Sequence, residues 1–353
     1  MMPGVLAVPE HRRAPLRALL DALAPLQRVV LTTHVNADGD GAGSEAAVAA
    51  WLTSAGKTVH IANPTPFPAT YLHLLPAGEL LRDPGHAETA RAIREADALF
   101  VLDTAEPRRI GRVAAAAAGK PVLLLDHHVP TESGFAGPGL QDPAACATGE
   151  LVYDLLCSAA WPRPWPEPAR IGIYTAVVTD TGSFRFANTT RRAHEIAGDL
   201  IEQGVDPERE YRRIFATVPL RRVELLRHAL QHLEVDPQFP LTWISVERAV
   251  MEELGATVED LEGLVEHARS IEGTEVALMF RETADGATKI SLRSAGDVDV
   301  NAIARQFGGG GHVKAAGAVI AEPLPRAREL VLTAVRAALA AGGLAFRAPR
   351  ERT

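Results

Sequence analysis

The sequence predicts an α/β protein of two domains, each built around its own sheet. Short apolar segments rich in β-branched residues alternate with helical segments, and they fall at 28–34, 57–63, 96–104 and 120–128. This alternation predicts a mainly parallel sheet with helices on both faces. After residue 236 the pattern changes to strands at 241–247, 275–283 and 288–294, which predicts a second, smaller α/β domain. A chain of 353 residues is long enough for both.

The first domain is expected to span residues 1–215. It opens with a short amphipathic helix at 14–24, ahead of the first strand. Residues 43–56 predict a helix that begins near Ser44. The segment RRIGRVAAAAAG is expected to be helical between the third and fourth strands. Two more helices are predicted at 148–160 and 168–180, on either side of the proline-rich segment WPRPWPEP.

A helical connector is expected at 216–235, followed by the second domain at 236–345. Its strands are joined by helices near 258–270 and 298–307, and the segment GGGGHVKAAGAVI follows the second of these helices.

The composition limits the classes of partner and compartment. A formal net charge of -8 argues against a protein that coats long nucleic acid, because such binding needs many Lys and Arg contacts to phosphate. A local basic pocket for a small phosphorylated ligand is compatible with this charge. Two cysteines, Cys146 and Cys157, are too few for a disulfide framework and suit a reducing compartment. We find no signal-peptide pattern and no long apolar run, so we expect a cytoplasmic protein with no membrane span.

Polar side chains follow three of the four predicted strands. His34, Asp38 and Asp40 follow the first strand, Asp103 follows the third, and Asp126, His127 and His128 end the fourth. Because ligands bind at the carboxyl ends of strands in open parallel sheets, these residues are expected to meet in one crevice, together with Asp180 from a later turn. Each motif alone has an ordinary explanation; Asp103, for example, could cap a helix.

Carboxylate oxygens and imidazole nitrogens suit divalent ions of intermediate hardness, Mn²⁺ above all, with Mg²⁺ and Co²⁺ as rivals. Two such ions can share a carboxylate and activate a bridging water for in-line attack on phosphorus. The joint occurrence of these motifs therefore predicts a dinuclear metal site.

Five motifs in this order resemble a known family. HVNADGDGAGS, VLDT, LLLDHH and VTDTGSFRF resemble the four motifs of the DHH phosphoesterase superfamily, and GGGGHVKAAG resembles the signature of the DHHA1 domain. The resemblance covers roughly residues 15–340 and is greatest to the branch of bifunctional oligoribonucleases and pAp phosphatases. One departure is Ala37, where proline is often expected; it removes no ligand.

The resemblance implies a role for each matching residue. His34, Asp38 and Asp103 would hold one Mn²⁺, and the second would be held by Asp40, Asp103, His127 and Asp180. Asp126 would orient an imidazole. His128 would face the scissile phosphate as a charge stabiliser or as a proton donor to the leaving oxygen, so that His128 and Asp103 are the expected catalytic residues.

A second informative stretch lies around the four glycines of the second domain. Gly308, Gly309, Gly310 and Gly311 precede His312, and Arg293 and Ser294 end the strand before them. Glycines allow a phosphate to approach the backbone, and arginine can bind a phosphate bidentately. A flexible hairpin loop is the alternative. With the resemblance, we expect a phosphate cradle here, made of Arg293, Ser294, Gly309, Gly310, Gly311 and His312, and an active-site cleft between the two domains.

The expected function is Mn²⁺-dependent hydrolysis of RNA of two to five nucleotides to 5′ mononucleotides, with dephosphorylation of pAp (3′-phosphoadenosine 5′-phosphate) to AMP. Short oligoribonucleotides and pAp are thus the expected partners, and long duplexes are not. A phosphodiesterase for cyclic dinucleotides such as c-di-AMP, or for pApA, would use the same residues. A non-catalytic nucleotide sensor is the alternative of another class, and the loss of a metal ligand would favour it. A homodimer is compatible with the resemblance, and the sequence leaves the oligomeric state open.

Two further motifs leave alternatives open. Thr148 is expected at a helix N-cap, and Glu150 either supports the metal ligands or complements the helix dipole. Phe184 and Phe186 follow the fourth motif, where a phenylalanine either stacks on a base or packs into the core.

Overall fold

The computed structural model describes residues 6–75, 80–130 and 134–344. The chain divides into two compact units, Met1–Thr217 and Val218–Thr353, and each unit is described by itself. The expected end of the second domain, residue 345, lies outside the described residues.

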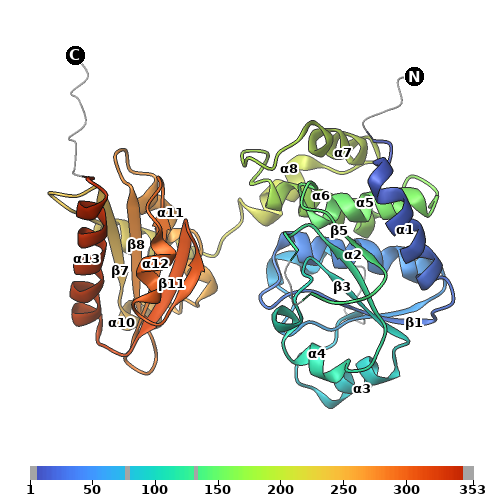
Figure 1. The fold of residues 1–353 in the computed structure, drawn as a ribbon, viewed down its shortest axis with the longest axis horizontal. Helices are drawn as coiled ribbons and strands as arrows, with labels where there is room; N and C mark the ends of the chain where they lie inside the picture. Colours follow the sequence, from blue (N-terminus) through green and yellow to red (C-terminus); the bar gives the residue numbers. More distant parts are fainter. Residues whose placement is uncertain (1–5, 76–79, 131–133, 345–353) are drawn as a thin grey trace. The chain divides into compact units, whose positions relative to one another are not determined.

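The first unit contains a five-stranded parallel sheet in the order β2-β1-β3-β4-β5 (Figure 1). Its strands are β1 (Arg28–Thr32), β2 (Thr58–Ile61), β3 (Ala98–Leu102), β4 (Val122–Asp126) and β5 (Gly139–Gln141). The four predicted strands are all present. The fifth has only three residues, too few for a recognisable pattern.

Helices cover both faces of this sheet, which confirms the predicted fold class. One face carries α1 (Glu10–Leu23), α2 (Gly39–Ser54), α5 (Thr148–Ser158), α6 (Glu167–Asp180) and α7 (Arg191–Glu202). The other carries α3 (Ala87–Glu95), the 3-10 helix η3 (Pro107–Ile110) and the short α4 (Arg112–Ala116). A further 3-10 helix, η1 (Ala69–Leu74), also packs on α2.

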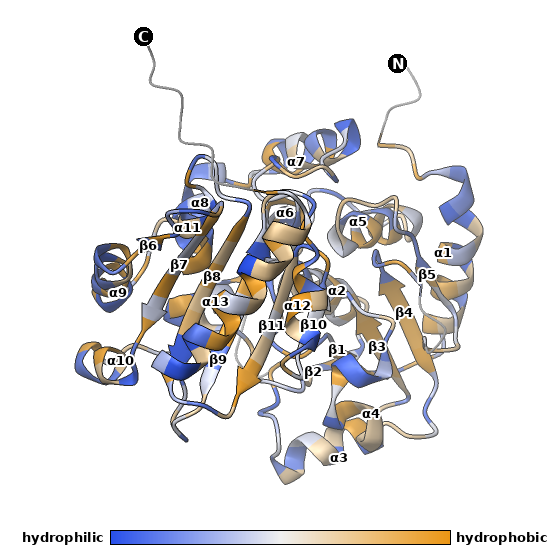
Figure 2. Ribbon diagram, turned by 60° about the vertical axis from the view of Figure 1, so that its left-hand side comes forward, coloured by the Kyte–Doolittle hydropathy of each residue, from blue (hydrophilic) through white to orange (hydrophobic). Residues whose placement is uncertain are grey.

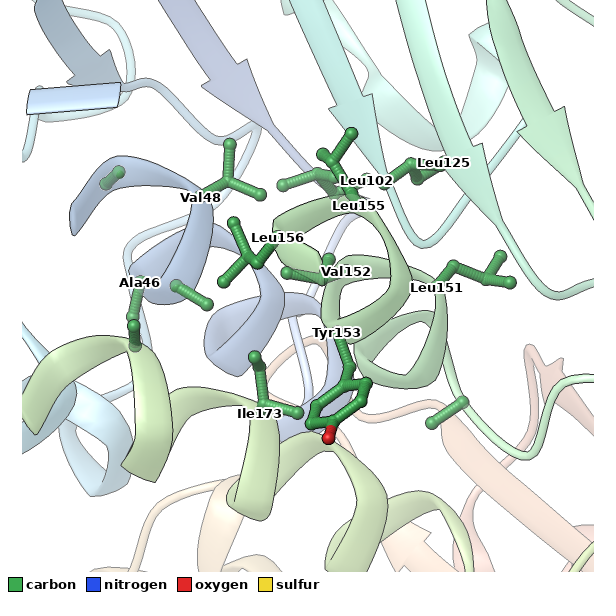
Figure 3. Close-up of a cluster of buried hydrophobic side chains, with 14 of the residues drawn as sticks. Ala46, Val48, Leu102, Leu125, Leu151, Val152, Tyr153, Leu155, Leu156 and Ile173 are labelled. Atoms are coloured by element: carbon green, nitrogen blue, oxygen red, sulfur yellow. The ribbon is translucent and has the colours of Figure 1, made fainter. Parts of the chain in front are cut away.

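Strand alternation divides the buried side chains between two cores. Val29 and Leu31 pack with the helices of the first face, whereas Val30 packs with those of the second. Leu102 and Leu125 from the strands meet side chains from α5 in the larger core (Figure 3). Leucine, valine, isoleucine and alanine supply most of these side chains, as the low aromatic content requires.

Helix α2 begins at Gly39, four residues before the predicted range of 43–56 and five residues before Ser44. Asp38 is its N-cap, since Asp38 Oδ1 accepts hydrogen bonds from the N–H groups of Asp40 and Gly41. The glycine-rich first turn has low helix propensity, but it packs tightly: a Cβ on Gly43 would collide with the carbonyl oxygen of Gly172 on α6. Close contact between two helices therefore explains a helical segment that propensity argues against.

The second unit contains a six-stranded sheet in the order β10-β11-β9-β8-β7-β6. Only the β7–β8 pair is parallel among its described pairings. The strands are β6 (Glu234–Val235), β7 (Leu241–Val246), β8 (Val276–Glu282), β9 (Thr288–Ser294), β10 (Gly310–His312) and β11 (Ala315–Ile320). In Figure 2 strand β8, an inner strand of this sheet, is largely hydrophobic.

Helices cover this sheet on both faces as well. One face carries α12 (Val300–Arg305) and α13 (Leu324–Ala341). The other carries α9 (Leu220–Gln231), α10 (Arg248–Leu254), η4 (Glu259–Leu261) and α11 (Leu264–Arg269). The expected connector at 216–235 thus contains a helix, α9, that packs through Leu225 and Ala229 into the second unit. Helix α8 (Pro207–Ile214) lies in the first unit.

Among the described residues, no helix combines the length and the apolar character that crossing a membrane would require.

Candidate metal centre

The carboxyl ends of β1, β3 and β4 bring the predicted ligands to one edge of the first sheet. His34 lies two residues after β1, Asp103 comes directly after β3, and His127 follows the last residue of β4. Asp103 has a left-handed backbone, with φ 62°. Such a conformation is uncommon for a residue other than glycine, and it turns the chain sharply at the strand end.

A first group consists of His34, Asp38 and Asp103. His34 Nε2 lies 3.3 Å from Asp103 Oδ2 and 3.7 Å from Asp38 Oδ2. The other ring nitrogen, Nδ1, is 2.9 Å from the carbonyl oxygen of Val35 and donates to it, so Nε2 is the nitrogen directed at the carboxylates. Burial works to lower the pKa of His34, but the two carboxylates outweigh it and raise that pKa to about 10.

A second group consists of Asp40, His127 and Asp180, and Asp103 lies against it as well. His127 Nε2 lies 3.6 Å from Asp180 Oδ2, 3.7 Å from Asp40 Oδ2 and 3.7 Å from Asp103 Oδ1. Burial and the neighbouring carboxylates raise the pKa of Asp40 well above its usual range. The pKa of Asp180 rises to about 6, chiefly through burial. Two buried carboxylates, Asp40 and Asp103, beside the partly buried Asp180 call for a cation.

We call these six residues, His34, Asp38, Asp40, Asp103, His127 and Asp180, the carboxylate–histidine cluster. Asp103 is common to both groups, with one oxygen toward each histidine. Among the described residues, the buried Nε2 of His34 has no hydrogen-bond partner, although a buried polar atom normally has one. Oxygen and imidazole ligands without thiolate suit two divalent ions that share Asp103. The residues therefore fit the metals that the sequence implies.

His128 lies beside the cluster but is bound differently. Its Nδ1 is 2.7 Å from Asp126 Oδ1, and its backbone N–H donates to the same oxygen. The Asp126 hydrogen bond is the largest cause of a raised pKa at His128. Asp126 is fully buried, and its other oxygen accepts a hydrogen bond from Gln141. Asp126 therefore orients the His128 imidazole, and the His128 side chain stays 42% exposed.

The start of α5 holds the cluster in a way that the sequence did not indicate. Asp40 accepts hydrogen bonds from the backbone N–H groups of Thr148 (2.6 Å) and Gly149 (2.8 Å). The Thr148 hydroxyl donates to Asp103 Oδ1 at 2.9 Å. Thr148 is not the N-cap that we expected, since Ala147 takes that position. No local pattern marks this role, because it depends on where α5 meets α2 in space.

A buried ion network supports the start of α5. Arg12 on α1 binds Asp142, Glu150 and Asp154 at 2.6–2.8 Å, and all four side chains are at least nine-tenths buried. Glu150 also accepts a hydrogen bond from the N–H of Cys146. Of the two alternatives for Glu150, the structure favours support of the site, through the segment that presents Thr148 and Gly149 to Asp40. Arg12 was missed, since a lone arginine in an amphipathic helix gives no signal.

The glycine segment of the second unit is a strand rather than a loop over Gly310–His312. Two of its glycines have packing reasons. A Cβ on Gly311 would lie 2.5 Å from the carbonyl oxygen of Ala315. A Cβ on Gly309 would overlap the carbonyl oxygen of Gly317. Glycines here thus serve the close approach of β10 to β11, so their number alone does not argue for a phosphate site.

The cradle residues divide into two sets. Ser294 is fully buried and its hydroxyl donates to the carbonyl oxygen of Gly296, so it offers no free hydroxyl to a ligand. His312 and Arg293 instead flank Ala315 in one row across β10, β11 and β9, which puts them on the same face of the sheet. His312 is exposed, and the Arg293 side chain is about one-third exposed and held by Glu266 at 3.0 Å.

Both units of the chain are similar to known proteins. Residues 28–175 match the DHH family, N-terminal domain, and residues 245–341 match the DHHA1 domain. A bifunctional oligoribonuclease and PAP phosphatase NrnA of Thermus thermophilus is 33% identical over 323 residues, 89% of this chain and 91% of that protein. The protein of the same name from Bacillus subtilis is 26% identical, covering 86% of this chain and 92% of its own length.

A solved structure has the same fold over nearly the whole chain. It is that of an exopolyphosphatase-related protein from Bacteroides fragilis, with a TM-score of 0.83 and 26% identity. The match covers 93% of this chain and 96% of the other.

Proposed function

Because this chain belongs to the DHH family of phosphoesterases, we propose that it hydrolyses very short RNA to 5′ mononucleotides and pAp to AMP, with two Mn²⁺ ions. The observation that carries the proposal is Asp103, whose two oxygens face two separate groups of ligands. The names of the relatives from Thermus thermophilus and Bacillus subtilis support this choice of substrates.

The two ions would be held by the carboxylate–histidine cluster, one by His34, Asp38 and Asp103 and the other by Asp40, Asp103, His127 and Asp180. When bound, they supply Lewis-acid chemistry, which polarises a phosphoryl oxygen and makes water a nucleophile at neutral pH. The residues around them keep this set in place. Thr148 and Gly149 direct the Asp40 carboxylate, and the carbonyl of Val35 fixes the His34 tautomer that leaves Nε2 for a metal.

His128 is the proposed proton donor to the leaving oxygen. Its Nδ1–H donates a hydrogen bond to Asp126, so Nε2 is the nitrogen that can release a proton toward a substrate. The hydrogen bond to Asp126 favours the protonated ring and raises the pKa of His128, and the protonated ring is the form that can donate. Partial exposure of the ring is consistent with contact to a bound phosphate.

The second unit is proposed to bind another phosphate of the substrate through Arg293 and His312. They share one face of the sheet with the small Ala315 between them, and both side chains can donate hydrogen bonds to an anion. Arg293 donates from Nε to Glu266 and from Nη1 to the carbonyl oxygen of Leu292, so a phosphate would be bound at Nη2. Ser294 has no part in this proposal.

A side-by-side turnover assay tests the proposal. The substrates are an RNA dinucleotide, a long labelled RNA, pAp, cyclic di-AMP and pyrophosphate, each with Mn²⁺ and with Mg²⁺. Fast cleavage of the dinucleotide and pAp, with slow cleavage of the long RNA, is the expected result. If the protein preferred cyclic di-AMP, the proposed substrate would be wrong, but the proposed roles of the residues would stand. Absence of turnover in protein that binds Mn²⁺ would identify a sensor instead of an enzyme.

A further inference from the structure

The turn after Asp180 separates two phenylalanines that the sequence could not distinguish. Phe184 is half-buried against the larger core of the first unit, and its ring stacks on that of His194 with centroids 4.6 Å apart. Phe186 is 57% exposed. The sequence left base stacking and core packing open for both residues, and the structure assigns core packing to Phe184.

The conformation of this turn is unusual and is held by several hydrogen bonds. Gly182, Ser183 and Phe184 follow one another in the left-handed region, with φ of 55°, 58° and 63°. The N–H groups of Arg185 and Phe186 both donate to the carbonyl oxygen of Thr181. Left-handed backbone at two residues other than glycine persists only where surrounding contacts impose it, and such strain occurs often at functional sites.

The turn folds the Phe186 ring back onto Gly182. A Cβ added to Gly182 would lie 2.5–2.6 Å from three atoms at the tip of that ring, so the ring lies directly against Gly182. Gly182 is two residues from Asp180, whose carboxylate is 3.6 Å from His127 Nε2. An exposed aromatic ring therefore packs on the glycine that lies two residues after a proposed metal ligand.

We propose that Phe186 is a platform on which a nucleobase of the substrate stacks, and that it is a specificity-determining residue of this site. This inference rests on the proposed function, because it takes the ligand to be a nucleotide. Aromatic rings stack on every base, so the platform would favour nucleotides over phosphoesters without a base and would discriminate little among the four bases. An apolar contact with a second protein is the competing use of such a ring, and the experiment below separates the two.

The test compares substrates with and without bases in the Mn²⁺-loaded protein. KM is measured for the dinucleotide ApA and for two analogues, each with one abasic residue. We expect Phe186→Ala to raise KM for ApA roughly 5- to 150-fold. It should leave KM unchanged for the analogue that lacks the stacked base. Phe186→Trp should restore the wild-type KM, since tryptophan stacks at least as well. Tyr211→Ala is the matched control, because Tyr211 is an aromatic residue on α8 of the same unit and is 53% exposed.

Binding of products provides a readout that needs no turnover. Calorimetry gives the affinities for AMP and ribose 5-phosphate in wild type and in Phe186→Ala. A selective loss of AMP affinity supports the platform even if the wild type cleaves neither RNA nor pAp, in which case only the proposed reaction fails. Equal effects on AMP and ribose 5-phosphate, or none on either, would overturn the platform. A change in oligomeric state in Phe186→Ala, with the AMP affinity unaltered, would also overturn it in favour of a protein contact.

Discussion

Substitution of one glycine at the crossing of α2 and α6 should disturb the metal centre from a distance. A Cβ on Gly172 would lie 2.5 Å from the carbonyl oxygen of Gly43, a separation that folded proteins do not tolerate. In Gly172→Ala the two helices must therefore move apart by roughly 0.5–1 Å. Asp40 lies in the first turn of α2 and Asp180 is the last residue of α6, so this movement separates ligands of the same proposed ion.

Two magnitudes follow from this displacement. Overpacking of a close-packed interior costs about 1–3 kcal/mol of the free energy of unfolding. A misplacement of catalytic groups by about 1 Å can lower the rate about 10²-fold. Gly172→Ala should thus show a modest loss of stability together with a much larger loss of kcat and a weaker affinity for Mn²⁺.

The assay combines urea denaturation with kcat at saturating Mn²⁺, and Gly198→Ala is the matched control. Gly198 also lies inside a helix, α7, but a Cβ there would meet nothing within 4 Å. Its substitution should stabilise the protein by about 0.5–1 kcal/mol and leave kcat unchanged. If Gly172→Ala behaved like Gly198→Ala in both measurements, the argument that helix contact positions the ligands would be refuted.

Three further predictions concern single side chains. Asp103→Ala removes the shared ligand, so it should abolish turnover on every substrate and lower the Mn²⁺ stoichiometry in calorimetry; wild-type rates would contradict a dinuclear site. Burial raises the pKa of Glu45 on α2 from 4.5 to about 8, so the contribution of this residue to the stability of the metal-free protein falls as pH rises from 4.5 through 8. Glu45→Gln should therefore stabilise the metal-free protein by roughly 3–5 kcal/mol at pH 9 and not at all near pH 4.5, and equal denaturation midpoints at pH 9 would contradict this. Arg293→Ala should raise KM roughly 10- to 100-fold with little change in kcat. Lys289 is an exposed residue of the same strand, and Lys289→Ala should change neither KM nor kcat. Matching KM values in the two variants would exclude the phosphate contact.

The sequence by itself determined the two-domain α/β class and the candidate ligands. Hydrophobic periodicity is a local property, and it predicts the strands. Because the carboxyl ends of parallel strands lie at one edge of a sheet, the sequence alone predicts that His34, Asp103 and His127 lie close together. Residue chemistry then indicated a divalent ion. The five motifs also identified the family, and the comparisons agree with that identification.

Only the tertiary structure decided which groups orient those ligands and which phenylalanine is exposed. Thr148, Gly149 and Arg12 act on the cluster from helices distant in sequence, and no local pattern encodes a contact between helices. The early start of α2 has the same origin, because packing against α6 overrides the low helix propensity of its glycines. Ser294 shows that a motif alone does not decide orientation. It follows Arg293 in the sequence, but strand alternation places its side chain on the opposite face, where it is buried and its hydroxyl donates to the carbonyl oxygen of Gly296. Identity and spacing are local properties, whereas orientation and burial depend on the whole packed fold.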